Sequence, residues 1–142
     1  MDSYELLKTI HVLAIAAWFG GGLVQGLVGE RARRRSREER RAILEESLWA
    51  GGRFYPAAAA VALVTGILMV VDHPTYGFAD PWVTIAMTGW LLASLNGGLL
   101  VGRAVKAAIA DDAAFPRVLV FTRLDSLLLA LIVADMVIKP GG

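Results

Sequence analysis

The chain has 142 residues, the size of one domain, and it contains no cysteine. Hydrophobic residues make up 56% of the sequence and charged residues 19%, with a formal net charge of +1. Of the 27 charged side chains, 12 lie between residues 30 and 46, so the remaining sequence is apolar over long runs. This distribution excludes a soluble globule, a disordered chain and a nucleic-acid-binding module with a broad basic face. The sequence therefore predicts a small integral membrane protein.

Four segments are long and apolar enough for transmembrane helices, which need about 20 mostly apolar residues. They cover residues 4–29, 54–71, 81–102 and 118–138. The second and third carry no charge, whereas the fourth contains two aspartates and one arginine. Backbone groups in lipid find partners only within a helix or a closed barrel, and long apolar runs are typical of helices. The sequence predicts one all-α domain, a four-helix transmembrane bundle.

Lysine and arginine set the expected orientation of this bundle. The first connection, residues 30–47, holds seven arginines, and the third, residues 103–117, holds three basic residues. The second connection, residues 72–80, holds none. Because basic loops stay on the cytoplasmic side, the first and third connections are predicted to be cytoplasmic and both termini outside. The basic loop 30–47 is expected to extend the first two helices into the cytoplasm, where it could touch anionic lipid headgroups.

The expected depth of each residue groups side chains from different helices. On the outer side we expect His11, Met69, Met87, Met136 and Asp135. On the cytoplasmic side we expect Gln25, Arg53, Asn96, Arg103, Arg123 and Asp125. An ionisable side chain inside a span usually faces the interior of the bundle, so the face of the first helix that carries His11 is predicted to point inward.

An inward-facing histidine could bind haem iron, bind another metal, relay a proton or simply accept or donate a hydrogen bond. In a haem site, His11 would be the axial ligand, and arginines near an interface could pair with the propionates. The candidates for this role are Arg53, Arg103 and Arg123. In the simplest alternative, His11 is hydrogen-bonded to Asp135 or to a backbone carbonyl.

A copper(I) site is a second possibility, because nitrogen and thioether are the only soft ligands in a chain without cysteine. It would combine His11 with Met69, Met87 and Met136. A third possibility is a structural or accessory membrane subunit without any ligand. The residues alone leave these three functions open.

Small residues suggest how the helices approach one another. Gly22-xxx-Gly26 and Gly98-xxx-Gly102 have the spacing that lets membrane helices pack closely. We interpret this spacing first as packing within the chain and second as the interface of a homo-oligomer. The basic loop lacks the interleaved aromatic residues of a nucleic-acid platform, so no nucleic-acid partner is expected.

Several stretches resemble the HemJ-type protoporphyrinogen oxidases. The opening Leu-Lys-Thr-Ile-His-Val at 7–12, followed by Ala-Trp-Phe-Gly-Gly at 17–21, resembles the start of that family. Arg-Leu-Asp at 123–125 and Val-Ile-Lys-Pro at 137–140 are similar to its end. The outline is shared with copper-resistance-D-like membrane proteins. The resemblance implies a four-helix bundle in the bacterial inner membrane, b-type haem bound through His11, and oxidation of protoporphyrinogen.

Two departures from the family pattern bear on the implied enzyme activity. The family carries a lysine shortly after the tryptophan of the third helix, whereas Trp82 is followed by Val-Thr-Ile-Ala. An asparagine is typical where Asp125 stands. These departures favour a noncatalytic relative that keeps the fold and the haem.

Overall fold

The computed structural model describes residues 2–141 and is helical along most of that length. The α-helices are α1 (Ser3–Ala32), α2 (Arg37–Asp72), α3 (Pro81–Leu95), α4 (Gly102–Ala110) and α5 (Phe115–Ile138). A π-helix, η1 (Asn96–Val101), joins α3 to α4, and a 3-10 turn, η2 (Asp112–Ala114), precedes α5. Because α3, η1 and α4 form one continuous rod, the bundle has four rods. The predicted all-α fold is confirmed.

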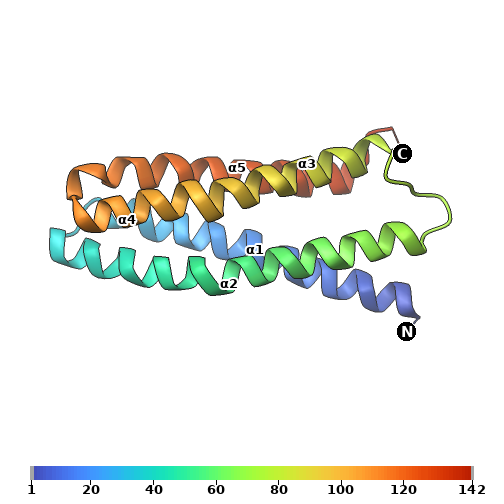
Figure 1. Cartoon of the computed structure of the whole chain (residues 1–142), viewed down its shortest axis with the longest axis horizontal. Coiled ribbons are helices and arrows are strands. Elements are labelled where there is room, and N and C mark those ends of the chain that lie inside the picture. The colour runs from blue at the N-terminus through green and yellow to red at the C-terminus, as the bar shows by residue number, and fades with distance from the viewer. Residues whose placement is uncertain (1, 142) are drawn as a thin grey trace.

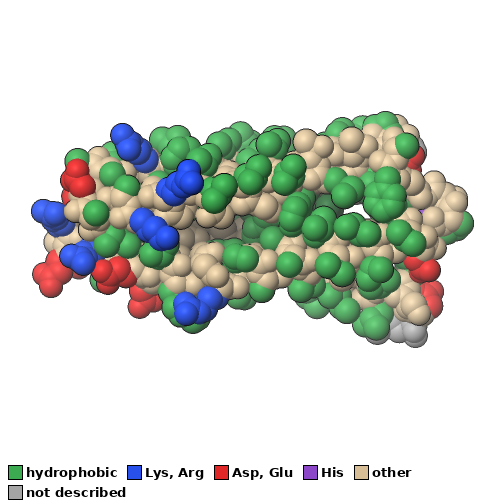
Figure 2. Space-filling model, in the orientation of Figure 1, with side chains coloured by type: hydrophobic (Ala, Val, Ile, Leu, Met, Phe, Trp, Pro, Cys, Tyr) green, Lys and Arg blue, Asp and Glu red, His purple; other side chains and the backbone are tan. Residues whose placement is uncertain are grey.

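The four rods lie side by side in alternating directions (Figure 1). Both termini and the α2–α3 connection lie at one end, called here the terminal end. The α1–α2 turn and the α4–α5 connection lie at the opposite end, called here the basic end. On the face shown in Figure 2, hydrophobic side chains cover the middle of the bundle, and Lys and Arg gather at the basic end.

Three of the rods are long and apolar enough to cross a membrane: Ser3–Ala32, Arg37–Asp72 and Pro81–Ala110. The fourth predicted span forms helix α5, whose 24 residues correspond to about 36 Å at about 1.5 Å per residue. Its length suffices for a bilayer, but Arg123, Asp125 and Asp135 interrupt its apolar sequence.

The basic segment 30–47 is mostly helical rather than a loop. Helix α1 continues to Ala32, residues 33–36 form the turn, and α2 begins at Arg37. A capping box starts α2, because the Ser36 side chain accepts the Glu39 backbone N–H and the Glu39 carboxylate accepts the Ser36 N–H. The expected extension of the first two helices is therefore confirmed, and the loop itself is only four residues long.

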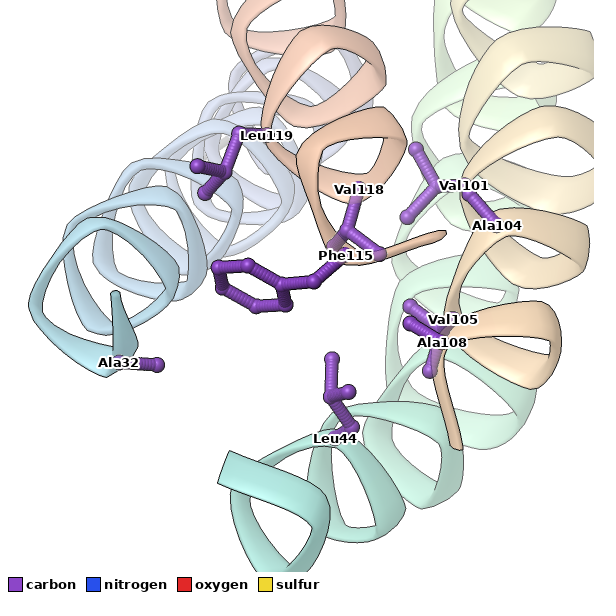
Figure 3. Packing of buried hydrophobic residues seen from close by; sticks show 9 residues of the cluster. All are labelled: Ala32, Leu44, Val101, Ala104, Val105, Ala108, Phe115, Val118 and Leu119. Carbon is purple, nitrogen blue, oxygen red and sulfur yellow. The ribbon is translucent and has the colours of Figure 1, made fainter. Parts of the chain in front are cut away.

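The basic end holds the larger of two hydrophobic clusters. It joins all four rods, and its members are less than 10% exposed. Figure 3 shows Phe115 of α5 among the side chains of this cluster: Ala32, Leu44, Val101, Ala104, Val105, Ala108, Val118 and Leu119. Small residues dominate on α4, which lets the rods approach closely at this end.

Arg40 lies at the edge of this cluster and joins it to the charged residues of the basic end. Its guanidinium forms a salt bridge with Asp112 at 3.0 Å and donates to the carbonyl oxygens of Ala32, at 3.3 Å, and Arg35, at 2.9 Å. It also lies 4.9 Å from the centre of the Phe115 ring. One side chain of α2 thus ties together the end of α1, the turn η2 and the start of α5.

A second cluster, centred on Trp18 and Leu129, lies in the middle of the bundle. Here α3 and α5 are in close contact, because a Cβ added at Gly89 would lie 2.6 Å from Cγ1 of Ile132. The indole N–H of Trp90 donates to the Ala59 carbonyl at 2.9 Å and links α3 to α2. From this cluster toward the terminal end, α2 and α3 diverge (Figure 1).

Candidate functional site

The divergence of the helices encloses a cavity of about 600 Å³ toward the terminal end, called here the terminal cavity. Figure 2 shows the surface open between α2 and α3 at this end. The size is within the range of small-molecule sites, and the walls are mainly aliphatic and aromatic. Four side chains that the depth grouping assigned to the outer side line this one cavity: His11, Met69, Met87 and Met136.

His11 is held in one orientation by α2. Its Nδ1 lies 2.9 Å from the carbonyl oxygen of Ala62 and 3.1 Å from Oγ1 of Thr65. A carbonyl oxygen can only accept, so Nδ1 carries the proton. The Thr65 hydroxyl donates to the Val61 carbonyl at 2.6 Å, which leaves its oxygen free to accept from the imidazole. The expected hydrogen bond to a backbone carbonyl is thus confirmed, whereas Asp135 is not the partner of His11.

The other ring nitrogen is available for a ligand. Within residues 2–141, Nε2 of His11 has no hydrogen-bond partner, and with the proton on Nδ1 it presents a lone pair. The ring packs against Gly66, where an added Cβ would lie 3.1 Å from Cε1 of His11. A hydrogen bond from Nδ1 to a backbone carbonyl is the usual way in which proteins orient a metal-binding imidazole.

A chain of aromatic rings lies at the mouth of the terminal cavity, and three of them, Tyr4, Tyr76 and Trp82, line it. Tyr4, His73, Tyr76 and Trp82 follow one another with ring centres 5.3, 4.1 and 5.2 Å apart. Lys139, at the end of α5, donates to the Tyr76 hydroxyl at 3.0 Å. Its Nζ lies 4.5 and 5.1 Å from the ring centres of Tyr76 and Trp82, which is cation–π distance. Sequence reasoning missed this cluster, since its members come from four separate segments.

The mouth also offers unused donors. Trp82 Nε1 is buried without a hydrogen-bond partner in the described part of the chain. Lys8 and Lys139 line the cavity beside it. The two ammonium groups form a setting for an anionic group.

The three predicted arginines lie elsewhere. Arg53 is exposed and sits 5.5 Å from the Trp49 ring centre. Arg123 is exposed and pairs with Glu30, Nε to Oε1, at 2.7 Å. Arg103 lines a different cavity. The structure therefore does not bring these side chains together with His11.

That second cavity, called here the basic-side cavity, has a volume of about 560 Å³ and lies between the middle of the bundle and the basic end. Asp125 lines it, and its Oδ1 accepts from Asn96 Nδ2 at 3.0 Å. The same amide group donates to the Phe121 carbonyl at 3.0 Å. Asn96 is the first residue of the π-helix η1 and is 3% exposed. The cavity also brings Gln25 and Arg103 of the predicted cytoplasmic group near Asp125.

No protein-family model, curated protein or solved structure matches the chain at a significant level. Within residues 2–141 there is also no group of three or more His, Asp or Glu side chains placed to hold a metal ion. Function is therefore inferred from the two cavities and from His11.

Proposed function

We propose that the protein crosses the membrane four times, through α1, α2, the α3–α4 rod and α5, with both termini outside. The crossing of α5 is supported by the surroundings of its charges. Asp135 is 8% exposed, Asp125 is bonded to Asn96, and Arg123 is paired with Glu30. The same helix exposes large apolar side chains on its other face, with Leu127 and Leu131 each 57% exposed. Aspartates turned inward, an arginine paired with a carboxylate and leucines turned outward are typical of a span.

We propose that the terminal cavity binds haem b and that His11 is its axial ligand through Nε2. The single observation that carries this proposal is the hydrogen bond from Nδ1 of His11 to the Ala62 carbonyl, which keeps the proton on Nδ1 and leaves a lone pair on Nε2 of a residue that lines the cavity. The apolar and aromatic walls suit a porphyrin face. The thioethers of Met69, Met87 and Met136 are available as a second axial ligand, since all three line the cavity.

The basic residues at the rim of the terminal cavity are better placed to pair with haem propionates than the predicted arginines are. Lys8 and Lys139 lie there, whereas Arg53 and Arg123 do not line the cavity. The family lysine that follows the third-helix tryptophan is absent, but Lys139 of α5 puts an ammonium 5.1 Å from the Trp82 ring.

Bound haem would supply one-electron redox chemistry, with a potential tuned by its axial ligands and by burial. The residues of this chain bind and position it. The Ala62 carbonyl fixes the imidazole, the aromatic rings at the mouth limit access of water, and the lysines balance the negative charge. The function we propose is that of a haem-binding membrane protein in the bacterial inner membrane, redox-active and related to the protoporphyrinogen oxidases.

The absorbance spectrum of the full chain, expressed with ample haem and purified in detergent, tests this proposal. We expect a Soret band that disappears in His11→Ala. The matched control is His73→Phe, which removes the other histidine but keeps a ring against Tyr76, and it should retain the band. A wild-type protein without a Soret band, or a band that survives in His11→Ala, contradicts haem ligation by His11.

Copper(I) is the second candidate, and a specific observation favours it. The imidazole and three thioethers that face the terminal cavity are the ligand types that copper(I) selects. Copper bound at one equivalent, and lost when Met69, Met87 and Met136 are replaced by leucine, would support this function. A protein that takes up neither haem nor copper would instead be a structural or accessory subunit.

A further inference from the structure

Four glycines face the basic-side cavity without any packing reason for their small size. Gly51 and Gly52 of α2, Gly98 of η1 and Gly102 of α4 all line it. A Cβ added at any of these four positions would meet no atom within 4 Å. The predicted packing role of Gly98-xxx-Gly102 is therefore wrong for contacts within the chain. These glycines keep space open instead of bringing two helices together.

Gly22-xxx-Gly26 of α1 shows the contrast. An added Cβ at Gly22 would lie 3.6 Å from Leu129, and one at Gly26 would lie 3.8 Å from Ser126, both on α5. This pair packs against a neighbouring helix, as its spacing predicts. The open glycines of the basic-side cavity thus differ from the packing glycines of the same bundle.

The deep part of the basic-side cavity is polar and only partly satisfied. Ser94 lines it, and its Oγ is buried without a hydrogen-bond partner among the described residues. Asp125 uses Oδ1 to accept from Asn96, and no further hydrogen bond within residues 2–141 engages its carboxylate. Buried polar groups in proteins are almost always paired, with protein, water or a ligand. The Asp125 carboxylate therefore keeps hydrogen-bonding capacity in the deep part of this cavity, whereas the buried Ser94 oxygen is not accessible to an occupant.

Two basic side chains line the same cavity nearer the basic end. Arg103 and Lys106 of α4 are three residues apart, so they lie on one face of the helix. Within residues 2–141 neither has a carboxylate oxygen within 4.0 Å, whereas Arg40, Arg41 and Arg123 are each paired. Their unpaired positive charges favour an anion at this end of the cavity.

The depth of these charges points to a lipid headgroup. Arg103 and Lys106 lie about 10 and about 6 Å from the end of α4, at about 1.5 Å rise per residue. In the proposed four-span topology this is the headgroup region of the cytoplasmic leaflet. The cavity is also lined by Leu99, which is 49% exposed on the side of the bundle, so acyl chains can remain in the bilayer. Basic pockets between transmembrane helices on this side commonly hold anionic headgroups.

We propose that the basic-side cavity binds the phosphate of an anionic phospholipid. Arg103 and Lys106 bind the phosphate diester. The four open glycines provide the room for this headgroup. The proposal rests on the four-span topology but not on haem, because the terminal cavity is a separate space.

Native mass spectrometry of the full chain in detergent, titrated with defined lipids, tests the proposal. We expect phosphatidylglycerol to bind at least tenfold more tightly than phosphatidylcholine. Arg103→Gln/Lys106→Gln should remove this preference. The matched control is Arg34→Gln/Arg37→Gln, which removes two charges from the same end of the bundle outside the cavity and should retain it. The helical circular dichroism signal checks that each variant is folded.

A further variant keeps the test independent of net charge. Gly98→Leu fills the cavity and should weaken phosphatidylglycerol binding, because nothing else occupies that space. Equal binding of phosphatidylcholine, or binding that survives both Gly98→Leu and the double variant, overturns the proposal. Displacement of the lipid by millimolar glycerol 3-phosphate would overturn it in favour of a soluble phosphate ester.

Discussion

At the scale of single residues, the orientation of His11 depends on one turn of α2. The Ala62 carbonyl accepts from Nδ1, the Thr65 hydroxyl adds a second contact, and Gly66 offers no side chain where the ring lies. Each of these features comes from the backbone or from a small residue. The position of the proposed ligand nitrogen therefore depends on residues of α2 that would not themselves bind the metal.

Gly66→Ala tests this dependence. The added methyl group would lie 3.1 Å from Cε1 of His11, closer than ordinary van der Waals contact, so the ring must shift by a few tenths of an ångström. Because groups that orient a ligand histidine affect metal affinity by about 10- to 100-fold, we expect haem affinity to fall about tenfold in a haem titration of the purified protein. Gly20→Ala is the control, since a Cβ there meets nothing within 4 Å. Unchanged affinity in Gly66→Ala would show that the imidazole position does not govern binding.

The sequence predicted some of these residues and not others, for a physical reason. Depth in antiparallel helices follows from counting residues, so His11 and the three methionines were correctly expected on one side of the bundle, and they line one cavity. Rotation about a helix axis and contacts with backbone atoms do not follow from counting. Ala62 as a partner and Lys139 as the cation at the mouth therefore could not be predicted.

At the scale of whole elements, η1 is the feature with the weakest sequence signal. A π-helix inserts an extra residue into a turn and often marks a functional position. Here it begins at Asn96, whose amide reaches α5 at Phe121 and Asp125. In the sequence, residues 81–102 form one uncharged apolar run. A single π-helical turn does not interrupt such a run, so η1 could not be predicted. The predicted third span ended at residue 102, because the basic residues of α4 interrupt the apolar run. The helix in fact continues to Ala110.

Arg40 provides a prediction about how the helices are joined at the basic end. Its side chain is 16% exposed and pairs with Asp112, which is 32% exposed, and it also binds two carbonyl groups of the α1–α2 turn. Hydrogen bonds to charged groups contribute about 1.5–3 kcal/mol each when partly buried. We expect Arg40→Gln to lower the free energy of unfolding by about 2 kcal/mol, measured by denaturant titration in detergent micelles.

The matched control for Arg40 is its neighbour. Arg41 pairs with Glu45 at 3.0 Å on the surface, where the two side chains are 63% and 54% exposed. Exposed pairs of this kind contribute about 0.3–0.5 kcal/mol. Arg41→Gln should therefore be nearly neutral. Equal effects of the two variants on the free energy of unfolding would show that the contacts of Arg40 contribute no more to stability than an exposed salt bridge does.

At the scale of the whole molecule, apolar runs were enough to predict four antiparallel rods, and the cavities were not predictable. The terminal cavity arises because α2 and α3 diverge from the Trp18 and Leu129 cluster toward the terminal end. Divergence depends on the summed sizes of side chains at each level of the bundle, which periodicity does not report. The large side chain of Trp90 donates to the Ala59 carbonyl of α2, and it lines both cavities.

The last prediction follows from the four-span topology. It is simple to test because the sequence contains no native cysteine. Single cysteines at Arg34, in the α1–α2 turn, and at Thr75, in the α2–α3 connection, both replace exposed residues at opposite ends of the bundle. A membrane-impermeant thiol reagent applied to spheroplasts should label the cysteine at Thr75 and leave the one at Arg34 unlabelled until the cells are lysed.

A third cysteine at Pro140 decides whether α5 crosses. Pro140 is exposed and follows α5 at the terminal end, so a fourth span places it on the same side as Thr75. If the charges of α5 kept this helix from crossing, the cysteine at Pro140 would instead become accessible together with the one at Arg34. We expect labelling with Thr75, because Asp125 and Asp135 face inward and Arg123 has a partner near the basic end. An inside location for Pro140 would also take the Lys139 ammonium away from the outer mouth and so remove the proposed contact with haem propionates.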